Sequence, residues 1–229
     1  MDTQIISLSN QKGGVGKTTT CANLGIGLAR EGKRVLLVDC DPQASLTLSL
    51  GWRKPETLPV TLSTLMGRAL QEQPVHAEEA ILHHAEGVDL IPGSIALSGV
   101  EASLDTRQNV LKRVLDDCRK DYSHVLLDCM PSLGMMTINA LAAADSVLIP
   151  TIPHYLSVDG LGKLMESIGR MRRGLNKGLR VEGILITMAS RTTYAREISE
   201  LLRTQYGTKI KVFDTVIPHS IRAAECSTE

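Results

Sequence analysis

"IISLSNQKGGVGKTTTCANL", residues 5–24, contains a short apolar run, a glycine-rich stretch and a helical pattern, in that order. The run at 5–9 is typical of a strand, and Cys21, Leu24 and Leu28 fall on one stripe of the helix that follows the glycines. A strand, a glycine loop and a helix in succession form the context in which phosphate-binding loops occur. The segment therefore predicts an α/β fold with an anion site near its start.

The residues of this loop suit a nucleoside triphosphate. Glycines let several backbone N–H groups turn toward phosphate oxygens, and the following helix adds the positive end of its dipole. Lys17 would reach the β- and γ-phosphates, and the Thr18 hydroxyl would bind Mg²⁺. The usual pattern has glycine where this chain has Gln11, and Lys12 is an additional cation. On the residues alone, Lys12 serves either its own triphosphate or that of a neighbouring molecule.

The rest of the chain alternates between apolar runs and helical patterns. Helical spacing extends over about 158–171 and 194–205, whereas 51–76, with three prolines, is predicted to be an irregular excursion outside the sheet. We predict a doubly wound α/β fold, with a mostly parallel central sheet flanked by helices, in one domain spanning 1–229. Several of the predicted strands are apolar throughout, as expected for strands buried on both faces of a parallel sheet. Besides 5–9, the predicted strands lie at 34–39, 88–93, 124–128, 146–150, 182–188 and 212–218.

Three aspartates follow predicted strands, at the edge where α/β sheets bind ligands. Asp39 and Asp41 end the run at 34–39, and Asp128 ends the run at 124–128. An apolar strand before Asp128 suits a carboxylate that is directed at Mg²⁺, and a second aspartate could orient the attacking water. Asp41 precedes Pro42, so it could also serve as a helix cap. Together with the loop, these residues make up the minimal parts of an NTPase.

Composition excludes several classes of protein. Five scattered cysteines without a CxxC pair favour free thiols in a reducing cytosol over a disulfide framework or a zinc site. No apolar run approaches the roughly 20 residues that cross a bilayer, and the N-terminus lacks the pattern of a secretory signal. Lys plus Arg equals Asp plus Glu at 25 each, and aromatic residues make up 3%. Any nucleic-acid binding must therefore come from a local basic patch without aromatic stacking.

Four stretches together resemble a known family. They are "KGGVGKTT", "LLVDCDPQAS", "VLLDCMPSLGMMTINALAAADSVLIP" and "TVIPHSIR", and they occur in the family's order over nearly the whole chain. The chain is similar to the ParA/Soj partition ATPases within the MinD/ParA class, whose fold is a deviant P-loop NTPase. The resemblance implies an ATPase that uses ATP and Mg²⁺ and is weak until a partner stimulates it.

The resemblance also assigns roles to residues. Lys12 would be the signature lysine that crosses the interface of an ATP-sandwiched homodimer, and Asp41 would position the attacking water with Asp39 beside it in a first switch. Asp128 would open a second switch that runs to about Met136. The implied catalytic residues are Lys12, Lys17 and Asp41; the metal residues are Thr18, Asp39 and Asp128; and the nucleotide-binding residues are Lys12, Gly13, Gly14, Val15, Gly16, Lys17, Thr18, Thr19 and Pro218, the last near the adenine.

The implied partners are double-stranded DNA, bound without sequence preference by the ATP dimer, and a ParB-like protein that stimulates hydrolysis and release. The DNA contacts would come from Arg191 and Arg222. Five basic and no acidic residues fall in 170–180, although such a run is also typical of a solvated helix end. These partners imply a cytoplasmic, nucleoid-associated protein that makes no membrane contact.

Three features depart from the family pattern, and the sequence also admits three alternative functions. Met130 stands where the family has the first of two prolines, His219 replaces a frequent arginine, and 223–229 ends before the family's last strand and helix. A MinD-like membrane-associated ATPase would need a C-terminal amphipathic helix. A nitrogenase-iron-protein-like reductase would need a second cysteine near Cys129, and a binding module without turnover would not need Asp41 or Asp128.

Overall fold

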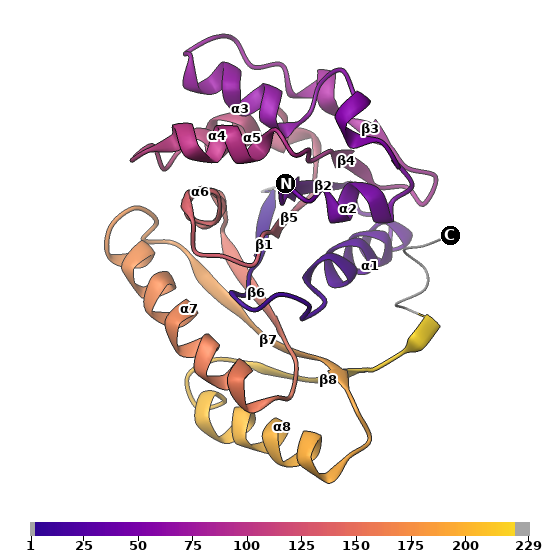
Figure 1. Cartoon of the computed structure of the whole chain (residues 1–229), viewed down its shortest axis with the longest axis vertical. Helices are drawn as coiled ribbons and strands as arrows, with labels where there is room; N and C mark the ends of the chain where they lie inside the picture. The colour runs from indigo at the N-terminus through magenta and orange to yellow at the C-terminus, as the bar shows by residue number, and fades with distance from the viewer. Residues whose placement is uncertain (1–2, 223–229) are drawn as a thin grey trace.

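An eight-stranded sheet forms the centre of the computed structural model, which describes residues 3–222 apart from the side chains of residues 156, 158 and 159 (Figure 1). The strand order is β3-β4-β2-β5-β1-β6-β7-β8, and neighbours are parallel except for β3 and β4. All seven predicted strands are present, and β3 is an additional one. The bounds are β1 Gln4–Leu8, β2 Val35–Cys40, β3 Leu82–His83, β4 Asp89–Ile91, β5 His124–Cys129, β6 Ser146–Thr151, β7 Arg180–Ala189 and β8 Val212–Pro218.

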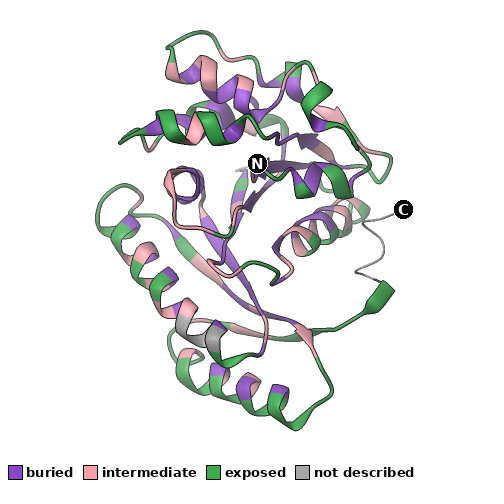
Figure 2. Ribbon diagram, viewed as in Figure 1, coloured by how far each residue is buried: buried purple, intermediate pink, exposed green. Residues whose placement is uncertain are grey.

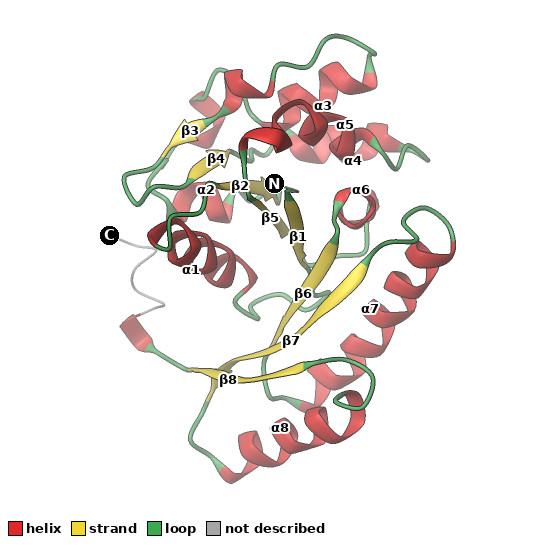
Figure 3. Ribbon diagram, turned by 180° about the vertical axis from the view of Figure 1, so that it is seen from behind, coloured by secondary structure: helices red, strands yellow, loops and turns green. Residues whose placement is uncertain are grey.

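Helices cover both faces of this sheet, which confirms the doubly wound fold (Figure 3). Successive strand residues point to opposite faces, so Leu36 and Val38 pack with the helices α3 to α8, whereas Val35 and Leu37 pack with α1 and α2. Because both faces are apolar, the central strands are buried on both sides (Figure 2). The helices are α1 Lys17–Arg30, α2 Ser45–Ser49, α3 Leu62–Leu70, α4 Leu97–Leu104, α5 Val110–Cys118, α6 Met135–Ala143, α7 Tyr155–Arg173 and α8 Thr193–Tyr206.

The segment 51–76 lies outside the sheet as expected, but it is more regular than its prolines suggested. It contains α3, whose Leu62, Leu65, Met66 and Ala69 are all buried in the larger core cluster. Thr61 caps this helix, and the Thr64 hydroxyl accepts the Thr61 N–H in return. The short helix is therefore part of the core and covers one end of the sheet.

The topology places a ligand crevice at the carboxyl end of β1. The chain moves from β1 to β2 on one side and from β5 to β6 on the other, so β1 lies where the strand order reverses. Leu8 in β1 is in register with Asp128 in β5, and Asp128 is in register with Asp39 in β2. The sheet thus gathers the glycine loop and two of the predicted acidic residues at one edge.

The four described cysteines, Cys21, Cys40, Cys118 and Cys129, are buried free thiols, and Cys226 lies with 223–229 outside the described residues. Within the described part of the chain, the search for an apolar helix long enough to span a bilayer found none.

Candidate nucleotide-binding site

The glycine loop adopts a backbone that needs its glycines. Gly14 and Gly16 have φ of 67° and 78°, in the left-handed region that side chains disfavour. Helix α1 begins at Lys17, directly after Gly16, and the first acceptor of its hydrogen-bond ladder is the Gly16 carbonyl, which accepts the Thr20 N–H at 2.9 Å. Since Gly16 has no side chain to cap the helix, the N–H groups of its first turn remain available to an anion.

Two polar side chains that the sequence analysis did not single out hold this loop in place. Asn10 accepts the Lys12 N–H at 3.0 Å and donates to the Pro150 carbonyl at 2.7 Å, which joins the loop to β6. The Thr187 hydroxyl in β7 lies 2.8 Å from the Val15 carbonyl. The position of Asn10 immediately after a buried strand is the one sequence signal that could have identified it, whereas Thr187 is distant in the chain.

The two lysines of the loop have different partners. Lys17 is buried, and its ammonium lies 3.4 Å from the Lys12 carbonyl. Burial lowers the pKa of Lys17, and the nearby carboxylates of Asp128 and Asp41 partly offset that shift. The ammonium of half-buried Lys12 instead donates to the Ser157 hydroxyl in α7 at 3.2 Å. The structure therefore separates the two cations.

Asp128 and Thr18 form the pair that suits a magnesium ion. The Thr18 hydroxyl donates to Oδ2 of Asp128 at 2.7 Å, whereas the buried Oδ1 has no hydrogen-bond partner among the described residues. Burial and then the neighbouring Asp39 raise the pKa of Asp128 to about 8. An unsatisfied buried oxygen beside a hydroxyl fits Mg²⁺, which takes few protein ligands and keeps waters and phosphates as the others. Accordingly, the described residues contain no cluster of three or more His, Cys, Asp or Glu that could bind a metal by itself.

Asp39 is arranged differently from Asp128, because the chain itself supplies its hydrogen bonds. Oδ2 accepts the Thr47 N–H at 2.8 Å and the Thr47 hydroxyl at 2.7 Å, and Oδ1 accepts the Asp41 N–H at 3.2 Å. Burial raises the pKa of Asp39 to about 6. A metal contact would have to share these oxygens, so Asp39 as a magnesium ligand stays a prediction. Asp41 is half-buried, and its Oδ1 accepts only the Gln43 N–H among the described donors, at 2.9 Å.

Known proteins are similar to this chain over most of its length. A family model described as an AAA domain matches residues 3–181. The sporulation initiation inhibitor protein Soj of Bacillus subtilis is 40% identical over 97% of this chain and 87% of its own length, and the chromosome-partitioning ATPase Soj of Thermus thermophilus is 42% identical over 96% and 83%. The chain belongs to the Soj/ParA family of partitioning ATPases.

A solved structure shares the family's fold with this chain. The crystal structure of cobyrinic acid a,c-diamide synthase from Mycobacterium smegmatis, with bound ADP and magnesium, has a TM-score of 0.87 and 37% sequence identity, and the match covers 99% of this chain and 91% of that chain. That protein is named as a synthase, whereas the relatives from Caulobacter vibrioides and Thermus thermophilus are named for chromosome partitioning. The shared fold includes the sheet edge at which the glycine loop, Asp39 and Asp128 meet.

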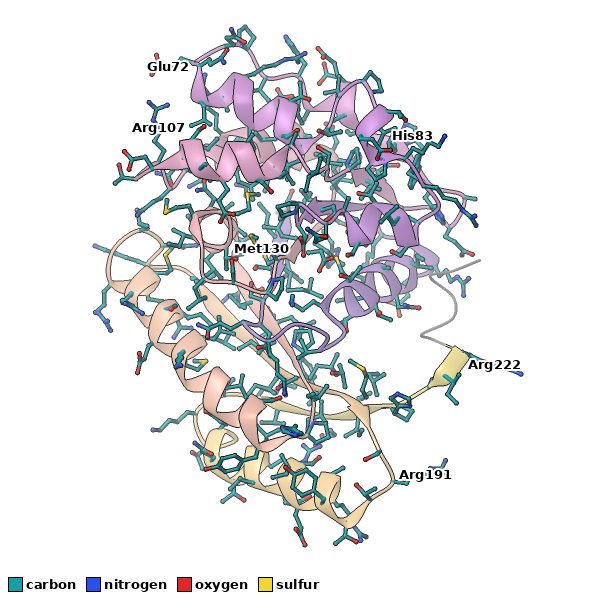
Figure 4. All side chains as sticks on the ribbon, in the orientation of Figure 1. Glu72, His83, Arg107, Met130, Arg191 and Arg222 are labelled. Atoms are coloured by element: carbon teal, nitrogen blue, oxygen red, sulfur yellow. The ribbon has the colours of Figure 1, made fainter. Side chains whose placement is uncertain are left out.

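The other predicted residues lie at or just after the carboxyl ends of β7 and β8, the last two strands in the sheet order. Pro218, the family's position near the adenine, ends β8 and is exposed. Arg191 follows β7 and Arg222 follows β8; both are exposed and project on the same side of the molecule in Figure 4. Met130, in place of the family's proline, is half-buried and packs against the larger core cluster. It therefore provides apolar contact directly after β5, where the sequence predicts a second switch.

Proposed function

We propose that this chain is one nucleotide-binding domain that dimerises with ATP, binds DNA without sequence preference in that state, and releases it on hydrolysis. The cargo would be a chromosome or a plasmid, and a ParB-like protein would stimulate hydrolysis. The cofactors would be ATP and Mg²⁺, and the location would be the cytoplasm, on the nucleoid. Family membership and the shape of the loop support the ATPase part, while the dimer and the DNA contacts are the proposed extension.

The observation that carries this proposal is the separation of the two lysines. Lys17, at the base of the loop, would bind the phosphates of the chain's own nucleotide. Among the described side chains, the Lys12 ammonium has one hydrogen-bond partner, the neutral Ser157 hydroxyl at 3.2 Å. A phosphate oxygen would be a stronger acceptor for the ammonium than this hydroxyl. A second cation at the mouth of the loop suits the nucleotide of a second copy.

The acidic residues divide the remaining tasks. Thr18 and Asp128 would hold Mg²⁺, which supplies positive charge to the phosphates when it is bound. Asp41 is the most exposed of the three carboxylates, at the edge of the sheet, so it would orient the attacking water and accept a proton from it. Asp39 would hold the backbone of Asp41 in place through the N–H bond described above.

DNA binding by a chain of zero net charge requires local contacts. Arg191 and Arg222 are exposed on one side, and two copies in a dimer would double the number of phosphate contacts. Each contact that releases counterions adds to the salt dependence of binding. A monomer with few contacts would therefore bind weakly, which links DNA binding to the ATP dimer.

Retention of a random-sequence DNA duplex tests this function. Wild type and Asp41→Ala are compared with Mg²⁺ and ATP, with Mg²⁺ and ADP, and without nucleotide. We expect retention only with ATP, and for longer in Asp41→Ala because hydrolysis is slowed. Arg191→Ala and Arg222→Ala should each weaken retention about tenfold and reduce the salt slope by about one, whereas the exposed Lys54→Ala should not. Equal retention with ATP and ADP in both proteins would overturn the proposal.

A further inference from the structure

A glutamate on α4 contacts the start of α6, the helix that follows Asp128 and its loop. The Met136 N–H donates to Oε1 of Glu101 at 3.1 Å. The two helices are in contact, and α4 lies directly above α6 in the view of Figure 1. The first turn of α6 contains no acidic residue, so the negative charge at this helix N-terminus comes from a different helix.

Gly134 makes room for this carboxylate. Its φ is −68°, which any residue can adopt, so backbone conformation does not require glycine there. A Cβ built on Gly134 would overlap Oε1 of Glu101 and lie 3.3 Å from the Ser132 hydroxyl. That hydroxyl already accepts the Gly134 N–H at 3.1 Å. Position 134 therefore needs glycine because the Glu101 carboxylate occupies the space that a side chain would fill.

The loop between β5 and α6 lies next to the phosphate loop at its other end. A methyl group built on Gly13 would lie 3.9 Å from Cβ of Pro131, so the space between the two loops is about that of one methyl group. Asp128, immediately before the loop, accepts the Thr18 hydroxyl. The Thr137 hydroxyl donates to the Ser132 carbonyl at 2.9 Å, which ties the loop to the first turn of α6. A shift of the first turn of α6 would therefore also move the loop between β5 and α6, which lies beside the phosphate loop.

We propose that Glu101 is a positioning residue that holds the segment 129–134 against the phosphate loop through the N-terminus of α6. Glu101 does not touch the nucleotide site; it acts by fixing Met136 and the space at Gly134. This inference rests on the proposed function for its effect on hydrolysis, because Asp128 and the segment 129–134 would have to be in place when ATP reacts. Its structural part, the hold on α6, stands on the contacts alone.

The test changes Glu101 and Gly134, first separately and then together. Glu101→Ala removes the acceptor and the charge, Glu101→Gln keeps an acceptor oxygen, and Gly134→Ala displaces the carboxylate while leaving it present. We expect Glu101→Ala to lower kcat for ATP hydrolysis about 3- to 10-fold, the effect of one ordinary net hydrogen bond, with KM changed less than about twofold. Glu101→Gln should keep at least about half of kcat. The double variant should be no slower than the slower single variant, because both remove the same contact.

Amide hydrogen exchange of the nucleotide-free protein provides a readout that needs no turnover. Exchange at 134–140 should be faster in Glu101→Ala and Gly134→Ala, and close to wild type in Glu101→Gln. The exposed Glu166→Ala in α7 is the matched control and should change neither exchange nor kcat.

Unchanged exchange at 134–140 in Glu101→Ala would overturn the proposal. If wild type hydrolyses ATP, a kcat of Glu101→Ala equal to that of wild type would overturn it as well. Additive losses in the double variant would also overturn it. A wild type without hydrolysis would instead overturn the proposed function, and the exchange measurement would still decide whether Glu101 holds α6.

Discussion

Asp128 is buried in a way that favours the protonated carboxyl when no nucleotide is bound. Burial raises the pKa of Asp128 to about 8 and that of Asp39 to about 6. A carboxyl with a folded pKa above its unfolded value binds protons more readily in the folded state. For these two groups, the free energy of unfolding of the free protein should therefore be highest below about pH 4, near the pKa of an unfolded aspartate, and should fall as the pH rises from there through 6 and 8.

Asp128→Asn should remove much of this pH dependence. The amide keeps the size of the carboxyl and can accept the Thr18 hydroxyl, but it has no charge to bury. Between pH 5.5 and 8.5, without nucleotide and with a chelator, wild type should lose on the order of 2 kcal/mol of unfolding free energy, and Asp128→Asn clearly less. Urea unfolding at each pH measures this, with the exposed Asp116→Asn as control. Parallel curves for wild type and Asp128→Asn would contradict the assigned pKa shift.

At the scale of elements, α6 connects the site to the rest of the helical layer. Asn139, fully buried in α6, accepts the N–H groups of Val110 and Leu111 at 2.9 and 3.2 Å and so caps α5. Its amide also donates to the Arg107 carbonyl at 2.9 Å and to the Met135 carbonyl at 3.0 Å. One side chain thus satisfies four backbone groups of three segments.

Asn139→Ala should lower the free energy of unfolding by about 2–4 kcal/mol, because it leaves buried N–H groups of α5 without an acceptor. Urea unfolding at constant pH measures the change. Asn23→Ala, which removes a single exposed bond to the Thr19 carbonyl in α1, should stay within about 0.5 kcal/mol. A loss below about 1 kcal/mol for Asn139→Ala would mean that water replaces the amide.

The strands were predictable and several helices were less so. Buried parallel strands are short and apolar throughout, and this pattern is visible without knowledge of contacts. Helix α5 carried an equally clear signal, since Val110, Leu111, Val114, Leu115 and Cys118 are buried at helical spacing. Helix α6 carried none, because it is buried on nearly every side and shows no polar stripe.

At the scale of the whole molecule, the question is whether two copies share the nucleotide site. Lys12→Ala should keep nucleotide binding by the monomer, because Lys17 and the loop N–H groups remain. ATP-dependent dimers should weaken at least about tenfold, since a charge-assisted contact across an interface contributes several times a neutral one. Sedimentation with ATP and Mg²⁺ measures the dimer.

The exposed Lys33→Ala is the control for this measurement, since it removes an equal charge away from the loop. If Lys12→Ala dimerises as strongly as wild type, Lys12 contacts the nucleotide bound by its own chain and not that of a second copy.

The sequence by itself determined the strand order along the chain, the phosphate loop and the acidic strand ends, because apolar runs, glycines and aspartates act over a few neighbouring residues. The resemblance of four stretches then determined the family. Only the tertiary structure decided the partners of those residues: Ser157 for Lys12, Thr47 for Asp39, Asn139 for α5 and Glu101 for α6. Each of these contacts joins residues that are far apart in the chain or in different elements, and such contacts depend on how the helices pack on the sheet.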